Sequence, residues 1–252
     1  MGLSSIELIL VALLAFSGAV VQGAIGFGLA IVAAPFLILI HPELVPGPVM
    51  FFGLVSACIN LWGNLSGLNL RELTLAFIAR VPGTLIAMAV LLVATASSLS
   101  ILLGLTVLLA VLVSVRTPKV NRTPKVMMLA GFMSGFMGTT TAIGGPPMAL
   151  AYQSATGASV RANLGAYMII GMIMSLIALV FVGRFNWDHL VISLIMVIPV
   201  ILGALLARWL MIKIQPNSLR PAVLVLCICS GVLALVKGLY QHFNSGLFSG
   251  VL

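Results

Sequence analysis

The segment GFMGTTTAIGGPPMAL, residues 135–150, combines threonines, glycines and prolines within a chain that is otherwise rich in aliphatic residues. Its glycine pair, 144–145, directly precedes a proline pair, 146–147, and proline is favoured in the first turn of a helix. We therefore expect a short helix to begin near residue 146, with its free N–H groups directed toward the threonine run 139–141. A helix N-terminus carries a partial positive charge, glycines let a ligand approach the backbone, and threonine hydroxyls donate hydrogen bonds. This chemistry favours a small oxyanion.

A second glycine-rich stretch, VQGAIGFGLAIVAAP at residues 21–35, has the same character. A shift of 112 residues places Gly26 on Gly138. The same shift places Pro35 on Pro147, and the correspondence continues along both halves at slightly larger shifts. We interpret this as an internal duplication. The alternative for both stretches is that their small residues only let helices pack closely, and two breaks at equivalent positions make that alternative weaker.

The composition defines the class of protein in which these stretches lie. Of 252 residues, 62% are hydrophobic and 6% are charged, whereas a soluble domain has about 25% charged residues. The long apolar runs predict an all-α polytopic membrane protein. The net charge of +8 does not indicate a nucleic-acid partner, because the cations lie in short loops between apolar runs. The scattered cysteines and histidines predict no metal site, and we expect no cofactor.

The most polar linker, RTPKVNRTPK at 116–125, divides the chain into a first repeat, 1–115, and a second repeat, 126–252. Each repeat contains a broken hairpin, either re-entrant or made of two short crossings, followed by three transmembrane helices. An odd net number of crossings per repeat makes the two repeats inverted, a common design in secondary transporters. The apolar segments, eight to ten of which we expect to enter the membrane, are 6–21, 24–40, 47–66, 73–94, 99–115, 126–138, 146–156, 161–182, 189–211 and 220–238.

The charged residues predict the orientation of the chain. With the linker in the cytoplasm of an inner (plasma) membrane, both termini lie outside, and Arg184 and Lys237 also lie outside. The four acidic residues lie near segment ends, so no carboxylate occupies the middle of a predicted helix. The cations on the cytoplasmic side are Arg71, Arg116, Lys119, Arg122, Lys125, Arg161, Arg208, Lys213 and Arg220.

The predicted orientation does not assign Arg80 to either side of the membrane. It follows Glu72 by eight residues, which places it about 12 Å into a helix, and its repeat counterpart is Val197. A cation at that depth costs about 3 kcal/mol unless it is paired or hydrated. Arg80 therefore either faces a polar cavity or extends back to the membrane surface. Arg161 likewise either anchors the topology or guides an anion into the cavity.

Polar amides within apolar segments bind ligands or join helices. The candidate substrate-binding residues are Gln22, Gly23, Gly26, Gly28, Arg80, Gly138, Thr139, Thr140, Thr141, Gly144, Gly145, Gln153, Arg161 and Asn163.

Both glycine-rich stretches, together with VRANLGAY at 160–167, resemble the paired signatures of the sulfite exporter TauE/SafE family. The resemblance extends from about Glu7 to Lys237 and covers most of the candidate residues. Members of that family are implicated in moving sulfite, sulfonates and related organic anions. Where the family often has adjacent glycines, this chain has Phe27, which would narrow that side of the site.

The resemblance and the residues together predict a membrane transporter of a small organosulfur or carboxylate anion, such as sulfite, a sulfonate or a sulfoacetate-like compound. We expect it to act as an exporter by alternating access, with the lipid bilayer as its other partner and with homo-oligomer formation left open. One alternative is an anion channel of the same architecture. An intramembrane enzyme is the other alternative, and it lacks support because no nucleophile lies at a plausible spacing from a base.

Overall fold

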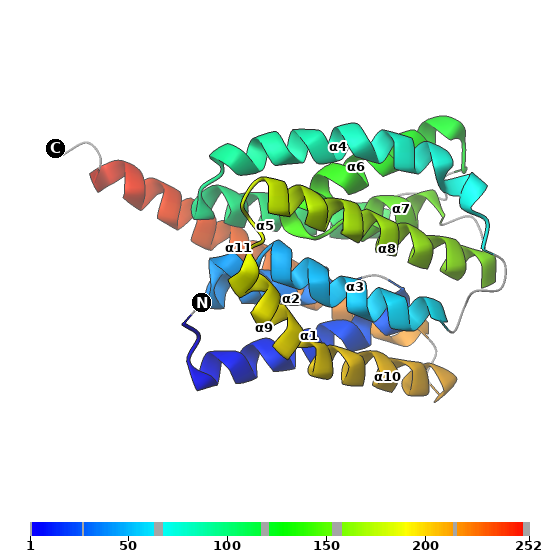
Figure 1. Cartoon of the computed structure of the whole chain (residues 1–252), viewed down its shortest axis with the longest axis horizontal. Helices are drawn as coiled ribbons and strands as arrows, with labels where there is room; N and C mark the ends of the chain where they lie inside the picture. Colours follow the sequence, from blue (N-terminus) through cyan, green and yellow to red (C-terminus); the bar gives the residue numbers. More distant parts are fainter. Residues whose placement is uncertain are drawn as a thin grey trace.

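The computed structural model describes residues 2–26, 28–62, 68–116, 121–152, 158–213 and 216–248, and in these ranges all regular structure is helical. Figure 1 shows the helices side by side along a common direction, with both chain termini at one end. The α-helices are α1 (Ser5–Ile25), α2 (Leu29–Ile40), α3 (Gly47–Trp62), α4 (Thr74–Val93), α5 (Ala96–Arg116), α6 (Pro124–Thr141), α7 (Gly145–Ala151), α8 (Ala158–Phe181), α9 (Trp187–Ile195), α10 (Val197–Lys213) and α11 (Pro216–Phe248). Short 3-10 helices, Pro42–Leu44 and Leu70–Leu73, precede α3 and α4.

Both predicted breaks are present. Helix α1 ends at Gly26, whose φ of 92° is the left-handed conformation that glycine adopts readily, and α2 begins after Gly28. Helix α6 ends at Ala142, which has a φ of 63°, and α7 begins at Gly145. A left-handed alanine costs on the order of 1 kcal/mol, so the surrounding packing must impose this sharp end.

The threonine run lies inside α6, which corrects the expectation that it forms part of the break. Thr140 donates its hydroxyl to Phe136 O at 2.8 Å, and Thr141 donates to Met137 O at 2.7 Å. These bonds to the preceding turn satisfy the hydroxyls within the helix. Helix α6 is therefore longer than the apolar run 126–138 from which it was predicted, and α7, which ends at Ala151, is shorter than the run 146–156.

Each hairpin joins a long helix to a short one. At 1.5 Å per residue, α1 and α6 are about 31 and 27 Å long, whereas α2 and α7 are about 18 and 10 Å long. The second hairpin returns to the end of the bundle from which it starts. Its two ends meet there, since the Cζ of Arg122, just before α6, lies 5.0 Å from the ring centre of Tyr152, just after α7. Figure 1 shows α1 starting and α2 ending at the opposite end of the bundle.

The apolar character of the helices matches a membrane protein. In the described ranges, four helical stretches are long and apolar enough to span a bilayer, and the bent pair α9–α10 raises the number to five. Large apolar side chains on the outer face, such as Leu13, Ile78, Leu92 and Phe181, are more than half exposed. A surface of this kind requires lipid around it. The chain is therefore an all-α multi-pass membrane protein.

The helices pair in the order that a duplication would produce. Helix α4 packs along α6, and α10 packs along α1. In the sequence correspondence between the repeats, α1 matches α6 and α4 matches α10, so each of these pairs is the repeat equivalent of the other. The remaining close pairs, α3 with α8 and α5 with α11, join equivalent helices. Together with the hairpins that start from opposite ends, this pairing supports two inverted repeats. The inversion and the repeat boundaries at 115 and 126 stay predictions.

Candidate anion site between the broken hairpins

The guanidinium of Arg80 lies inside the bundle, between α4, α6 and α8, and only 2% of the residue is exposed. Its Nη1 donates to Ser134 Oγ at 2.8 Å and to Tyr167 Oη at 3.3 Å. Its Nη2 donates to Gly171 O at 2.9 Å and to Ser175 Oγ at 3.0 Å. The side chain therefore does not extend back to the membrane surface, and that alternative for Arg80 is wrong.

The positive charge of Arg80 meets only neutral acceptors in the part of the chain that the structure describes. Its four hydrogen bonds go to hydroxyls and a carbonyl, and its buried Nε has no hydrogen-bond partner. Hydrogen bonds to a charged group stabilise it by about 1.5–3 kcal/mol each, but they do not neutralise the charge. A buried cation solvated in this way remains able to attract an anion.

An aromatic pair supports the guanidinium from one side. The Arg80 Cζ lies 5.4 Å from the ring centre of Tyr167, a distance at which the ring face attracts a cation. Phe77 stacks on Tyr167 with ring centres 5.1 Å apart. Because Tyr167 is fully buried, these contacts fix the position of the guanidinium.

Glycines provide the space that Arg80 occupies. A Cβ on Gly171 would lie 2.6 Å from Arg80 Cζ, and one on Gly138 would lie 3.2 Å from Nη2. A Cβ on Gly135 would lie 2.4 Å from the carbonyl oxygen of Arg80, so this glycine lets α6 approach the backbone of α4. The small residues of this region therefore serve both close packing and the placement of the cation.

One buried polar side chain fixes each break. Ser134, which accepts a hydrogen bond from Arg80, donates its own hydroxyl to Gly144 O at 2.6 Å. Gln22, at the equivalent position under the shift of 112, accepts from Leu29 N at 3.3 Å and donates to Gly53 O at 2.8 Å. Arg80 thus connects to the second break through Ser134, whereas Gln22 connects the first break to α3.

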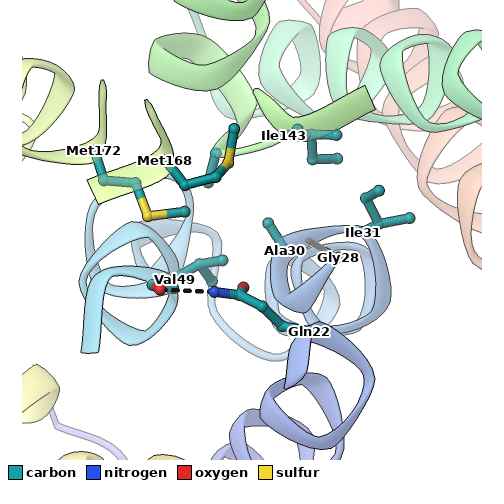
Figure 2. A pocket seen from close by; sticks show the side chains of 11 residues that line it. Gln22, Gly28, Ala30, Ile31, Val49, Ile143, Met168 and Met172 are labelled. Carbon is teal, nitrogen blue, oxygen red and sulfur yellow. Dashed lines mark hydrogen bonds between the residues drawn. The ribbon is translucent and has the colours of Figure 1, made fainter. Parts of the chain in front are cut away.

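Two adjoining cavities lie between the breaks. The first has an empty volume of about 330 Å³, and the second, of about 220 Å³, includes Arg80 in its wall. In Figure 2, Met168 and Met172 project from one side of the first cavity, while Ile143 and Ile31 form the opposite side. The residues that line both cavities are Ala142, Met168 and Met172.

Several predicted site residues meet here. Gln22, Gly28 and Gly145 line the first cavity, and Gly138 and Gly144 join Arg80 around the second.

The threonine run reaches this site only through Thr139. Its hydroxyl lies 2.8 Å from Ser175 Oγ, which in turn accepts from Arg80. The hydroxyls of Thr140 and Thr141 are used by their own helix, as described above.

Other candidates lie apart from the cavities. Gly23 packs against α10, where an added Cβ would lie 2.4 Å from Ala207 Cβ, and Gly26 is the exposed cap of α1. Asn163 lies in a separate polar cluster. The remaining predictions concern Gln153, Phe27 and the side chain of Arg161, which lie outside the part of the chain that the structure describes.

Backbone donors contribute less at the second break than the sequence suggested. Helix α7 begins as expected after a glycine, but Pro146 and Pro147 occupy its first turn and have no N–H. Arg80 is therefore the strongest donor in the cavity walls. Sequence reasoning missed Ser134, Tyr167 and Ser175, although the repeat correspondence of Ser134 with Gln22 was a signal that could have found the first of them.

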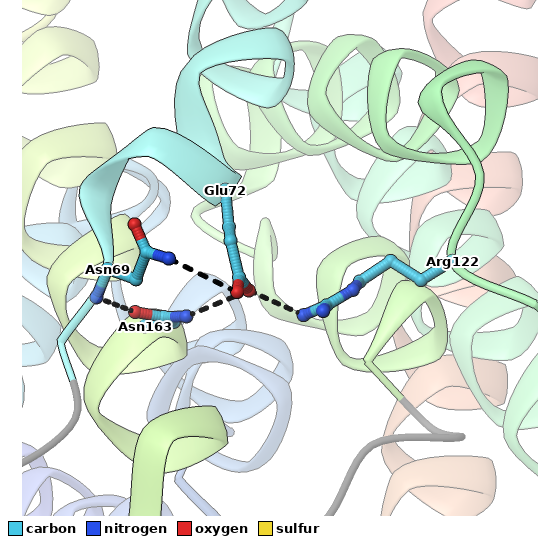
Figure 3. A network of polar contacts seen from close by, with 4 residues as sticks. All are labelled: Asn69, Glu72, Arg122 and Asn163. Carbon is cyan, nitrogen blue, oxygen red and sulfur yellow. Dashed lines mark hydrogen bonds and ion pairs between the residues drawn. The ribbon is translucent and has the colours of Figure 1, made fainter.

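A second polar cluster lies at the linker end of the bundle (Figure 3). The Glu72 carboxylate accepts from Arg122 Nη1 at 2.7 Å and from the side-chain amides of Asn69 and Asn163, each at 3.3 Å. The backbone N–H of Asn69 donates to Asn163 Oδ1 at 2.8 Å. The cluster joins residues before α4 in the first half to Arg122 in the linker and to Asn163 of α8 in the second half.

A helical membrane protein with two broken hairpins and a buried cation beside the second break has features typical of secondary transporters. The family model described as "Sulfite exporter TauE/SafE" matches residues 10–234, and the chain belongs to this family. The protein is accordingly a membrane transporter, and the resemblance noted in its sequence is confirmed. A search of curated proteins and a search of solved structures gave no match.

Proposed function

We propose that this protein exports a small organosulfur or carboxylate anion by alternating access, and that Arg80 holds the anion between the two broken hairpins. The observation that carries the proposal is a buried guanidinium with only neutral partners, an unpaired Nε and a place in a cavity wall. The four terminal N–H groups of Arg80 already have acceptors, so its Nε–H and its charge are what remain for an anion. An anion beside Arg80 would neutralise the charge that the described residues leave unbalanced.

The size of the cavities supports a small substrate. The space among the lining residues, about 330 and 220 Å³, includes openings to the outside, so the enclosed volume of each cavity is smaller still. Space of this kind favours a substrate of few atoms over a large one. Small, separate cavities also favour a carrier over the channel alternative, because a channel needs a continuous path.

The membrane potential favours the export of an anion. A monoanion that leaves an inside-negative cell gains about 2.3 kcal/mol per 100 mV, without a coupling ion. The described acidic residues support this simple scheme, since Glu7 and Glu72 lie at the starts of helices rather than at mid-membrane depth. Carboxylates at mid-membrane depth are typical of proton relays and cation pathways.

Alternating access requires contacts that open at one end while those at the other end stay closed. At the linker end, Glu72 of the first half binds Arg122 of the linker and accepts a hydrogen bond from Asn163 of the second half. At the opposite end, Arg184 of the second half donates to Leu91 O and Ala94 O, the last carbonyls of α4 in the first half. Polar contacts therefore join the halves at both ends, as in an occluded state between the two open ones.

The proposed orientation places the linker in the cytoplasm of the inner (plasma) membrane. The two cations that this orientation puts outside have local partners: Arg184 binds the end of α4, and Lys237 donates to Ile38 O and Leu39 O at the end of α2. Cations are favoured at helix C-termini, which carry a partial negative charge. These two cations therefore have a structural reason to lie outside. They do not contradict the proposed orientation, which rests on the excess of cations at the linker end.

The proposal is tested with purified protein in proteoliposomes, with sulfite, sulfoacetate and ethanesulfonate as substrates. We expect saturable uptake with counterflow, a loss of binding of about 10- to 150-fold in Arg80→Gln, which corresponds to about 1.5–3 kcal/mol, and partial activity in Arg80→Lys. Arg208→Gln, which removes an exposed cation from α10, is the matched control. Well-folded Arg80→Gln protein that binds and transports like the parent would refute the role of Arg80.

A further inference from the structure

Met168 and Met172 separate the two cavities of the anion site. They lie one turn apart on α8, and both side chains belong to the walls of both cavities. Met172 also reaches α3, because a Cβ on Gly53 would lie 2.9 Å from its Cε. Figure 2 shows both methionines projecting from α8 into the cavity, on the side opposite Ile31 and Ile143.

The two cavities differ in chemistry. The one that contains Arg80 has a cation in its wall, whereas the far side of the other is formed by Ala30, Ile31 and Ile143. The polar side chain there, Gln22, already uses its oxygen and its nitrogen in hydrogen bonds to the backbone. A ligand that entered the first cavity from Arg80 would therefore pass the methionines and then meet mainly apolar surface.

We propose that the substrate is an organic monoanion with a charged head and a short apolar tail, and that Met168 and Met172 determine how long the tail can be. The inference rests on the proposed function, in which the head binds Arg80. One buried cation matches one negative charge, so a dianion leaves a charge unpaired at a depth where this is costly. The tail passes between the methionines and the first hairpin toward Ile31 and Ile143.

Methionine suits this role because its unbranched, polarisable side chain changes conformation easily. It can close the space between the cavities when no tail is present and can pack along a tail when one enters. The competing explanation is that the two residues only fill the core. The two explanations differ in whether affinity depends on the length of the ligand.

The test is a calorimetric series on the purified full-length protein, from methanesulfonate to hexanesulfonate, with sulfite and sulfate for comparison. We expect affinity to rise about fourfold for each added methylene group, the effect of burying one CH₂, and then to fall once the tail exceeds the space available. Sulfite and sulfate should bind more weakly than the best sulfonate. A chain-length series on the parent protein needs no variant and therefore does not depend on a substitution that folds.

Variants then assign the limit to the methionines. Met168→Ala and Met172→Ala should move the optimum to a longer sulfonate, while Met128→Ala, on the exposed outer face of α6, should leave the series unchanged. Equal affinity for all chain lengths, or the same optimum in well-folded Met168→Ala and Met172→Ala proteins, would overturn the inference.

The Arg80→Gln variant separates this inference from the proposed function. If Arg80 binds the head, that variant should weaken every sulfonate by a similar factor and keep the same optimum length. A uniform loss in Arg80→Gln together with a flat series in the parent would refute the tail site and retain the anion site. No binding of any sulfonate or of sulfite by the parent would refute both the tail site and an organosulfur anion as the substrate.

Discussion

Replacing Gly171 with alanine tests the anion site without removing a polar group. The added Cβ would lie 2.6 Å from Arg80 Cζ and 2.9 Å from both Nε and Nη1. Real Cβ contacts are not this short, so the guanidinium must move. Gly171 O also accepts the hydrogen bond from Arg80 Nη2, and any shift of the guanidinium changes that bond as well.

The magnitude follows from the contacts that are lost. If the displaced guanidinium loses its contact with the anion, binding falls by about 1.5–3 kcal/mol, which corresponds to roughly 10- to 150-fold in Kd. Overpacking a buried site costs a further 1–3 kcal/mol of stability or thereabouts. In an open helical position, glycine to alanine would instead stabilise the protein by about 0.5–1 kcal/mol, so the sign of the stability change is informative.

The measurement is calorimetric binding of ethanesulfonate to Gly171→Ala protein in detergent, with thermal unfolding to follow stability. Gly165→Ala is the matched control, because it lies on the same helix and its Cβ would meet only the Leu61 side chain, at 3.3 Å or more. We expect the control to bind like the parent. Parent-like binding by a monodisperse Gly171→Ala protein would refute the reasoning, because the guanidinium could then move without consequence for the ligand.

Three further predictions concern the threonine run, the polar cluster and the orientation. Thr139→Val should weaken sulfonate binding several-fold through Ser175, whereas Thr140→Val should leave it unchanged, since that hydroxyl bonds within α6; equal effects in calorimetry would contradict this. Glu72→Gln should lower thermal stability by less than about 1 kcal/mol, because the ion pair with Arg122 is one-third exposed, yet it should increase cysteine labelling at the linker end. Unchanged labelling would show that the cluster does not help to keep the linker end closed. A cysteine at Asn121 should react with impermeant reagents only after the membrane is opened. Labelling of that cysteine in intact cells would contradict the predicted orientation.

The sequence predicted the class of fold and the position of both breaks because strong local chemistry determines them. Few charges over long apolar runs require a membrane, and glycines end a helix at each break, joined at the second break by prolines that start the next helix. The extent of α6 was predicted less well. Whether Thr140 donates to a ligand or to its own preceding turn depends on side-chain rotation, about which the residue type carries no information.

The site was only partly predictable for a similar reason. Arg80 was singled out because its depth in the helix was unusual, and that argument needed only sequence spacing. Its partners Ser134, Tyr167 and Ser175 are ordinary residues of transmembrane helices, and they become a cage only because α4, α6 and α8 meet at this depth. Sequence spacing within one helix contains no information on such a meeting.

The asymmetry of the two halves gives the site its polarity. Under the proposed duplication, each half contributes a broken hairpin held by one buried polar side chain, Gln22 in the first and Ser134 in the second. The cation breaks this equivalence, since Arg80 corresponds to Val197. Two cations facing two breaks would suit a dianion or a pair of anions, whereas a single cation beside one break suits one negative charge. Under the proposed function, the rest of the space, toward the first break, is left for the neutral part of the substrate, and we expect the transporter to select by the size of that part.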